Sequence, residues 1–156
     1  MLTGLEQVGL VVNLGDVPGE ASGSTKYPIL IPQNRDIKVT GAKVATIHNI
    51  YADDTTYAEF SLMKATPNSI ASGSGLGTGT CVAYLKTRDA GLSAAGLCNA
   101  GLCESTFAAL VVDSDEDEID EDDQLYLQVD QAGVGLSGDH LGLCSLTFQL
   151  EYEITE

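Results

Sequence analysis

Residues 113–123 form the densest group of side chains that could do chemistry, because nine of these eleven residues are Asp or Glu. Hard oxygen ligands at alternate positions could surround a calcium ion. An EF-hand loop needs glycine at its sixth position and glutamate at its twelfth, where this chain has Glu118 and Gln124. No helical pattern flanks the run. We therefore expect a solvated acidic loop that enters a strand at Gln124, with Ile119 as its apolar anchor, rather than a dedicated metal site.

A zinc site formed by the four cysteines is the weaker of two readings, since no pair has the two-residue spacing of a zinc knuckle; core and loop cysteines are the favoured reading. Cys98 and Cys103 lie in a glycine-rich loop, at a spacing that could close a small disulfide ring. Cys81 and Cys144 fall on strand patterns and are expected to be buried small apolar groups. The sequence leaves their redox state open.

Catalytic and phosphate-binding motifs are also incomplete. His48 lies in a strand pattern and His140 in a glycine-rich loop, so they supply no metal-binding pair. Ser74, between Gly73 and Gly75, lacks the strand–turn–helix frame that exposes a nucleophilic serine. The stretch 73–79 has no Lys–Ser/Thr pair after it and no helix to bind a phosphate. We expect no catalytic, cofactor-binding or metal-binding residue, and no enzyme activity.

Composition restricts the partners further. With 23 acidic and 7 basic side chains the formal net charge is −16. This charge repels phosphate backbones and anionic lipid surfaces, so neither nucleic acid nor a membrane is an expected partner. No apolar stretch approaches the roughly 20 residues that span a bilayer. Residues 1–14 lack a basic n-region and a continuous apolar core, so no signal peptide is expected.

Alternation of apolar and polar residues predicts the strands that would carry these loops. The clearest run is Ser145–Ile154, and the same period recurs in residues 8–14 and 124–130. Residues 27–31 could add an eighth strand, which Pro28 and Pro32 would confine to a sheet edge or an extended connection. Four weaker runs, rich in β-branched, aromatic or small apolar residues, are 37–51, 57–64, 81–87 and 106–112.

Seven or eight such strands, joined by long loops and without a helical period, predict an all-β fold. We expect an antiparallel β-sandwich, a jelly roll or a related Greek-key arrangement. Its 156 residues are expected to form one domain. Whether residues 1–36 form an extended N-terminal arm of that domain stays open.

The stretch from about residue 39 to 152 resembles the capsid cement or decoration proteins of tailed bacteriophages, which have a jelly-roll-like sandwich. The likeness rests on the segment Ile47-His-Asn-Ile-Tyr51, on the turn and strand at residues 52–62, and on residues 122–133 leading into the last strand. The acidic run departs from the pattern, because such proteins have a shorter and less charged approach to that strand. The loop with Cys98 and Cys103 is also particular to this chain.

The resemblance implies a non-enzymatic structural protein that binds the outer surface of a phage capsid and cements neighbouring subunits of the major capsid protein of the same virus. It also implies a homotrimer, synthesis in the host cytoplasm and a final place on the capsid exterior of the virion. The glycine-rich segment 15–23 is the first candidate for a reach to a neighbouring subunit.

Two other readings remain. In a carbohydrate-binding or host-adhesion domain of a phage fibre or spike, a sugar would stack on an exposed aromatic side chain. Without tryptophan, the platforms on predicted outward faces would be Tyr57, Tyr84 and Tyr126. A small enzyme on a cupin-like barrel would instead need clustered histidine and carboxylate ligands, which two separated histidines do not provide.

Overall fold

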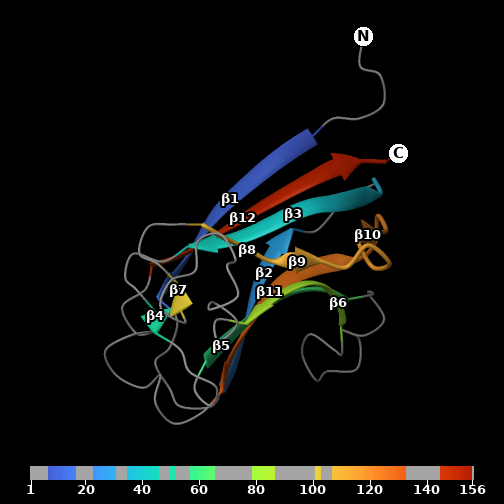
Figure 1. Cartoon of the computed structure of the whole chain (residues 1–156). Helices are drawn as coiled ribbons and strands as arrows, with labels where there is room; N and C mark the ends of the chain where they lie inside the picture. Colours follow the sequence, from blue (N-terminus) through green and yellow to red (C-terminus); the bar gives the residue numbers. More distant parts are fainter. Residues whose placement is uncertain are drawn as a thin grey trace.

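Twelve β-strands make up the secondary structure that the computed structural model describes, and each pairs antiparallel to its neighbours (Figure 1). The described residues are 7–16, 23–30, 35–45, 50–51, 57–65, 79–86, 101–102, 107–132 and 145–155. The long strands are β1 (Gln7–Asp16), β2 (Gly23–Leu30), β3 (Ile37–Ala45), β5 (Tyr57–Ala65), β6 (Thr80–Lys86), β11 (Gln124–Ala132) and β12 (Ser145–Ile154). The two-residue strands are β4 (Ile50–Tyr51), β7 (Gly101–Leu102), β8 (Ala108–Ala109), β9 (Val111–Val112) and β10 (Glu118–Ile119).

Two five-stranded sheets pack face to face (Figure 1). The first sheet has the order β1-β12-β3-β10, with β8 also pairing β3, and the second has the order β2-β11-β5-β6-β9. The first and last long strands pair in one sheet, and the second and next-to-last pair in the other. Such nesting is the strand order of a jelly roll, so the predicted antiparallel sandwich is confirmed.

All eight predicted strand regions contain strands. The last strand has the predicted bounds, Ser145–Ile154. β2 begins earlier than predicted and lies at the edge of the second sheet, where the missing N–H of Pro28 costs least. Residues 7–16 and 23–30, which the sequence left open as part of an arm, are paired strands of the two sheets.

The predicted strand 106–112 is divided between the sheets. β8 pairs with β3, and the Leu110 amide donates to the Ala42 carbonyl oxygen at 2.8 Å. β9 then pairs with β6 of the second sheet, and β10 returns to β3. This segment therefore ties the two sheets together along one side of the sandwich. In the part of the chain that the structure describes, no similar segment joins β1 to β2 on the opposite side.

Inward-facing side chains from both sheets fill one core. In β11, Leu125, Leu127 and Val129 are buried as their alternation predicts. The largest core side chains, each no more than 1% exposed, include Phe60, Phe148, Leu62, Leu146 and Ile119. Within the described ranges, no helix is long and apolar enough to cross a membrane.

Tyr126 departs from the predicted alternation because it points to the outer face of its sheet and is nevertheless only 1% exposed. Burial raises the pKa of its hydroxyl, and an amide hydrogen bond from Gly79 partly offsets that rise. A Cβ on Gly79 would lie 2.5 Å from the Tyr126 hydroxyl oxygen and 2.8 Å from the Lys64 carbonyl oxygen. The chain at Gly79 thus covers Tyr126 closely, and only glycine leaves room for it.

Candidate interaction surface

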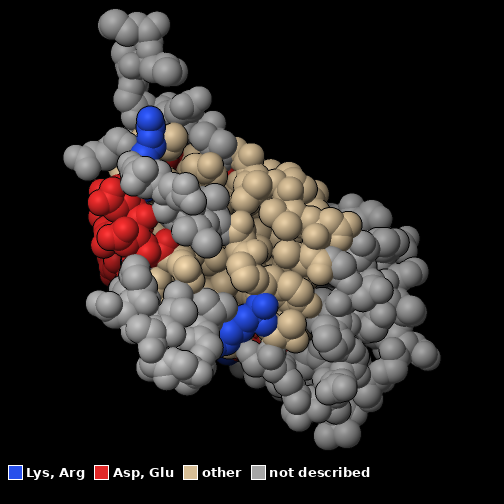
Figure 2. Space-filling model, turned by 180° about the vertical axis from the view of Figure 1, so that it is seen from behind, with Lys and Arg blue, Asp and Glu red and all other residues tan. Residues whose placement is uncertain are grey.

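The acidic run lies on the side of the sandwich where the divided segment joins the two sheets, and we call residues 113–123 the acidic edge. Figure 2 shows Asp and Glu side chains gathered on one side of the molecule. Two turns flank β10: the Glu116 amide donates to the Asp113 carbonyl oxygen at 3.1 Å, and the Asp123 amide to that of Asp120 at 2.9 Å. The edge is therefore a turn–strand–turn and not the open loop that the sequence predicted, although Ile119 is its buried anchor as expected.

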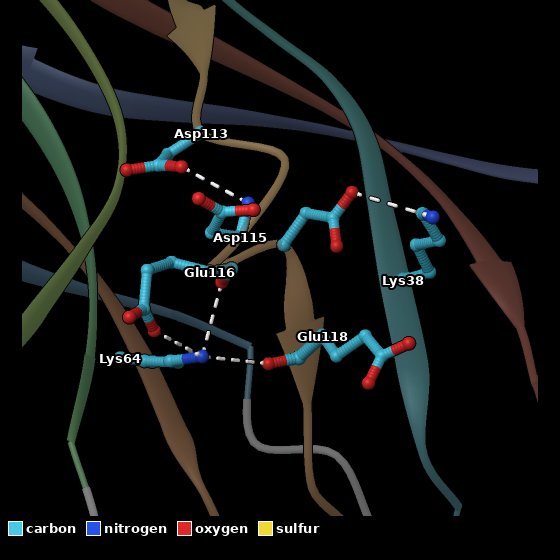
Figure 3. A network of polar contacts seen from close by, with 7 residues as sticks. Lys38, Lys64, Asp113, Asp115, Glu116 and Glu118 are labelled. Carbon is cyan, nitrogen blue, oxygen red and sulfur yellow. Dashed lines mark hydrogen bonds and ion pairs between the residues drawn. The ribbon is translucent and has the colours of Figure 1, made fainter.

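Lys64, at the end of β5, holds this segment in place (Figure 3). Its Nζ donates to the carbonyl oxygens of Glu116 and Glu118, at 3.0 and 2.9 Å, and lies 3.0 Å from Glu116 Oε2. An ammonium group has three protons, so these three acceptors account for all of them. Because β5 belongs to the second sheet and β10 to the first, this lysine also connects the sheets.

Strand β3 holds the same segment from the other side. The Val39 amide donates to the Asp117 carbonyl oxygen at 2.9 Å, and Lys38 Nζ lies 3.5 Å from Asp117 Oδ2. Just before β3, the Asp36 side chain accepts a hydrogen bond from the Glu121 amide at 2.9 Å. The backbone of the acidic edge is thus fixed to both sheets.

Most carboxylates of the edge point into solvent: Asp113, Asp115, Glu118, Asp120, Glu121 and Asp122 are exposed. Asp117 and Asp123 are each only 7% exposed, which the prediction of a solvated loop missed. Burial is the main cause that raises the pKa of Asp123, and the charges of Asp120 and Asp122 add to it. An amide hydrogen bond from Asp120 and the charge of Lys64 work in the opposite direction. The burial of Asp117 could have been inferred from the sequence, because Asp117 lies two residues before the apolar anchor Ile119. This spacing puts both side chains on one face of an extended chain.

The acidic edge has the chemistry of a fixed anionic surface. No group of three or more His, Cys, Asp or Glu residues among the described positions is placed to hold a metal ion. Six exposed carboxylates on a pinned backbone create a local negative potential that attracts basic side chains. The backbone that carries these side chains needs little ordering on binding, because hydrogen bonds already fix it to both sheets.

Cys81 differs from its prediction. It lies in β6, partly exposed, where a buried small apolar group was expected. Its thiol donates to the Ala83 carbonyl oxygen at 3.6 Å. Burial raises the pKa of the thiol and the charge of Glu59 raises it further, which disfavours the reactive thiolate. The remaining candidates, namely His48, His140, Ser74, Cys98, Cys103 and Cys144, lie outside the described residues.

The aromatic platforms of the carbohydrate reading are not assembled among the described side chains. Tyr84 is 44% exposed and is paired across the strands with Val111, which is 59% exposed. Tyr126 is covered and offers no face to a sugar. The Tyr57 side chain lies outside the described part of the structure. A single exposed tyrosine beside a valine is more typical of an ordinary sheet surface.

The strand order places the chain in the class of jelly-roll β-sandwiches. No protein-family model matches the sequence, and the search of curated proteins found no match. Among solved structures, a chain of the empty head of turnip yellow mosaic virus is similar over 100% of this chain and 84% of that chain, with 12% identity and a TM-score of 0.36. A second turnip yellow mosaic virus structure gives the same coverage and identity with a TM-score of 0.34. At this level of similarity neither structure carries an inference about what this chain does.

Proposed function

We propose that this chain is a non-enzymatic structural protein that binds the outer surface of a phage capsid and cements neighbouring copies of the major capsid protein. The observation that carries the proposal is the acidic edge, which presents exposed carboxylates on a backbone fixed to both sheets. The resemblance of residues 39–152 to capsid decoration proteins supports the same role.

The acidic edge suits a basic partner surface. Its exposed carboxylates would pair with Lys and Arg side chains of the capsid at the rim of the contact, which favours fast association and correct orientation. A backbone that is already ordered loses little conformational entropy when it binds. The role requires no moving part and no catalytic group, and the sign of the charge makes nucleic acid and anionic membranes unsuitable partners.

Co-sedimentation with purified capsids tests the proposal. We expect the protein to bind capsids in a saturable ratio, more weakly as salt rises, because exposed ion pairs are screened. The double variant Asp115→Asn/Glu118→Gln removes two exposed charges from the acidic edge and should weaken binding about tenfold, which corresponds to two surface pairs.

A matched control removes the same number of charges elsewhere. Glu151→Gln/Glu153→Gln lies on β12, in the middle of the first sheet, and should leave capsid binding unchanged. Equal weakening by both double variants would show a general charge effect and reject the assignment to the acidic edge. Wild-type protein that stays in the supernatant with capsids at every salt concentration would reject the proposed function.

A further inference from the structure

Among the strands that the structure describes, β1 forms an edge of the first sheet. In the first sheet β1 pairs with β12 on one side, and no described strand pairs with its other side. Residues 7–15 contain no charged residue and no proline. The neighbouring edge strand β2 differs, because Lys26 and Pro28 are the residue types that natural proteins use to block pairing at an edge. Only β1 among these two strands is suited to accept another strand.

We propose that β1 pairs antiparallel with β1 of a second copy of this chain, about a two-fold axis, so that two first sheets join into one continuous sheet. A strand that pairs with itself in this way forms an isologous contact, in which each copy offers the same surface. The pairing supplies main-chain hydrogen bonds to the edge groups of β1, as in other cases of strand addition.

The sequence of β1 favours one register. A bulge between Asn13 and Gly15 interrupts the regular ladder, so the pairing is centred before it. Centring the axis at Leu10 places Val11 of each copy opposite Gly9 of the other. Val11 is 62% exposed, and a Cβ on Gly9 would meet no atom within 4 Å. The exposed valine therefore packs over a position that has no side chain, without a clash.

The charge distribution makes this side the favourable one for self-association. β10 of the acidic edge lies at the far end of the same sheet, three strands from β1, or about 14 Å. In the joined sheet the two acidic edges would lie about 34 Å apart, which is several Debye lengths of about 8 Å at physiological salt. Two copies with a net charge of −16 thus approach through a strand whose residues 7–15 carry no charge.

Partly buried apolar side chains near the β1 edge provide a surface that a second copy could bury. Leu10 and Leu14 of β1, and Tyr27 and Ile29 of β2, pack against the core but remain only partly buried. They lie on the side where no described segment joins the two sheets. A second copy would bury part of this surface. Since a ladder of a few residues buries less than the roughly 1,000 Å² of a stable interface, the dimer should depend on protein concentration.

Sedimentation velocity over a concentration series tests the proposal. We expect a monomer–dimer equilibrium, with amide exchange in β1 slowing as concentration rises. Val11→Lys should weaken dimerisation about tenfold or more, because a charge at the edge opposes pairing and the dimer contains it twice. Val11→Thr keeps a neutral β-branched side chain and should dimerise like the wild type.

Val111→Lys is the matched control, since Val111 is a similarly exposed valine in β9, at the edge of the other sheet. It should leave the equilibrium unchanged. A monomer at all concentrations, a trimer as the resemblance to decoration proteins implies, or a dimer that dissociates with Val111→Lys and not with Val11→Lys would overturn the proposal. Capsid co-sedimentation is independent of these outcomes, so the dimer and the capsid role can fail separately.

Discussion

At the scale of single residues, Lys64 shows how one cation can order a strongly acidic segment. Its side chain is 18% exposed, and its three protons are directed at the carbonyl oxygens of Glu116 and Glu118 and at the Glu116 carboxylate. Lys38 makes a single, longer contact with Asp117 and its side chain is 44% exposed. Exposed pairs of that kind contribute little to stability, whereas hydrogen bonds from a mostly buried charge contribute more.

Lys64→Met should therefore lower the free energy of unfolding by about 2–3 kcal/mol, because it leaves carbonyl groups of the acidic edge without their donor. Lys38→Met should cost less than about 1 kcal/mol. Urea denaturation followed by circular dichroism measures both. Equal losses in the two variants would contradict the assigned role of Lys64.

The raised pKa of Asp123 predicts how the stability of the fold depends on pH. Its pKa in the folded protein is raised above the ordinary 3.8, chiefly by burial, so the native state holds this proton more tightly than the unfolded chain does. Stability contributed by this group falls as pH rises from 3.8 through the raised value, and the whole penalty is present at neutral pH.

Asp123→Asn should thus raise stability at neutral pH and lose that advantage near about pH 3, where the wild-type carboxyl is protonated. The asparagine oxygen can still accept the Asp120 amide. Denaturation at several pH values measures the effect, and Asp122→Asn, at an exposed neighbour, should give a smaller gain. A neutral-pH loss of stability in Asp123→Asn would show that its charge is needed in the fold.

Gly79 is constrained by its neighbours. Gly79→Ala should destabilise the protein by about 1–3 kcal/mol, since the new methyl group would overlap Tyr126 and the Lys64 backbone. Gly9→Ala, in open space on β1, should be close to neutral. Thermal unfolding of the two variants measures both effects. A loss of stability only in Gly79→Ala would show that the contacts of Gly79 with Tyr126 and Lys64 cause it, and not the replacement of a glycine in general.

At the scale of elements, the divided segment β8–β9–β10 replaces what would be one continuous edge strand. Alternate pairing with β3 and β6 closes one side of the sandwich and leaves only two-residue strands at the sheet edges there, which is a common way to protect an edge. The other side keeps the β1 edge. This asymmetry separates the anionic surface from the edge that we expect to self-associate.

The two-residue strand β10 depends on Ile119, which is fully buried. Ile119→Ala should cost about 2–4 kcal/mol and should increase amide exchange in residues 113–123 before the rest of the sheet. Glu118→Ala, at the exposed neighbour on the same strand, should have little effect. Uniform exchange along both sheets in Ile119→Ala would show that the acidic edge does not open as a separate unit.

At the scale of the whole molecule, the net charge of −16 opposes the compact state through self-repulsion. Raising potassium chloride from about 0.02 to 0.5 M should therefore raise the melting temperature, because the Debye length falls from about 20 Å to about 4 Å. Calorimetry measures the shift, with sucrose at equal osmolality as control. A melting temperature that falls with salt would mean that attractive ion pairs outweigh the repulsion.

The sequence alone determined the strands and the class of fold, because alternation with a period of two reports directly which face of a strand is buried. The run at residues 145–154 and the buried Leu125, Leu127 and Val129 follow from it. Ile119 was also recognisable as the apolar anchor of an acidic run. Net charge, counted from the sequence, argued against nucleic acid and anionic membranes as partners.

Only the tertiary structure decided which strands are neighbours and which surfaces meet. The burial of Tyr126 depends on Gly79, and the order of the acidic edge depends on Lys64, about fifty positions away in the chain. The division of residues 108–119 between two sheets, and the separation of the acidic edge from β1, likewise come from strand pairing. Local patterns cannot encode these contacts, because they arise between segments that are distant in sequence and meet only when the sandwich closes.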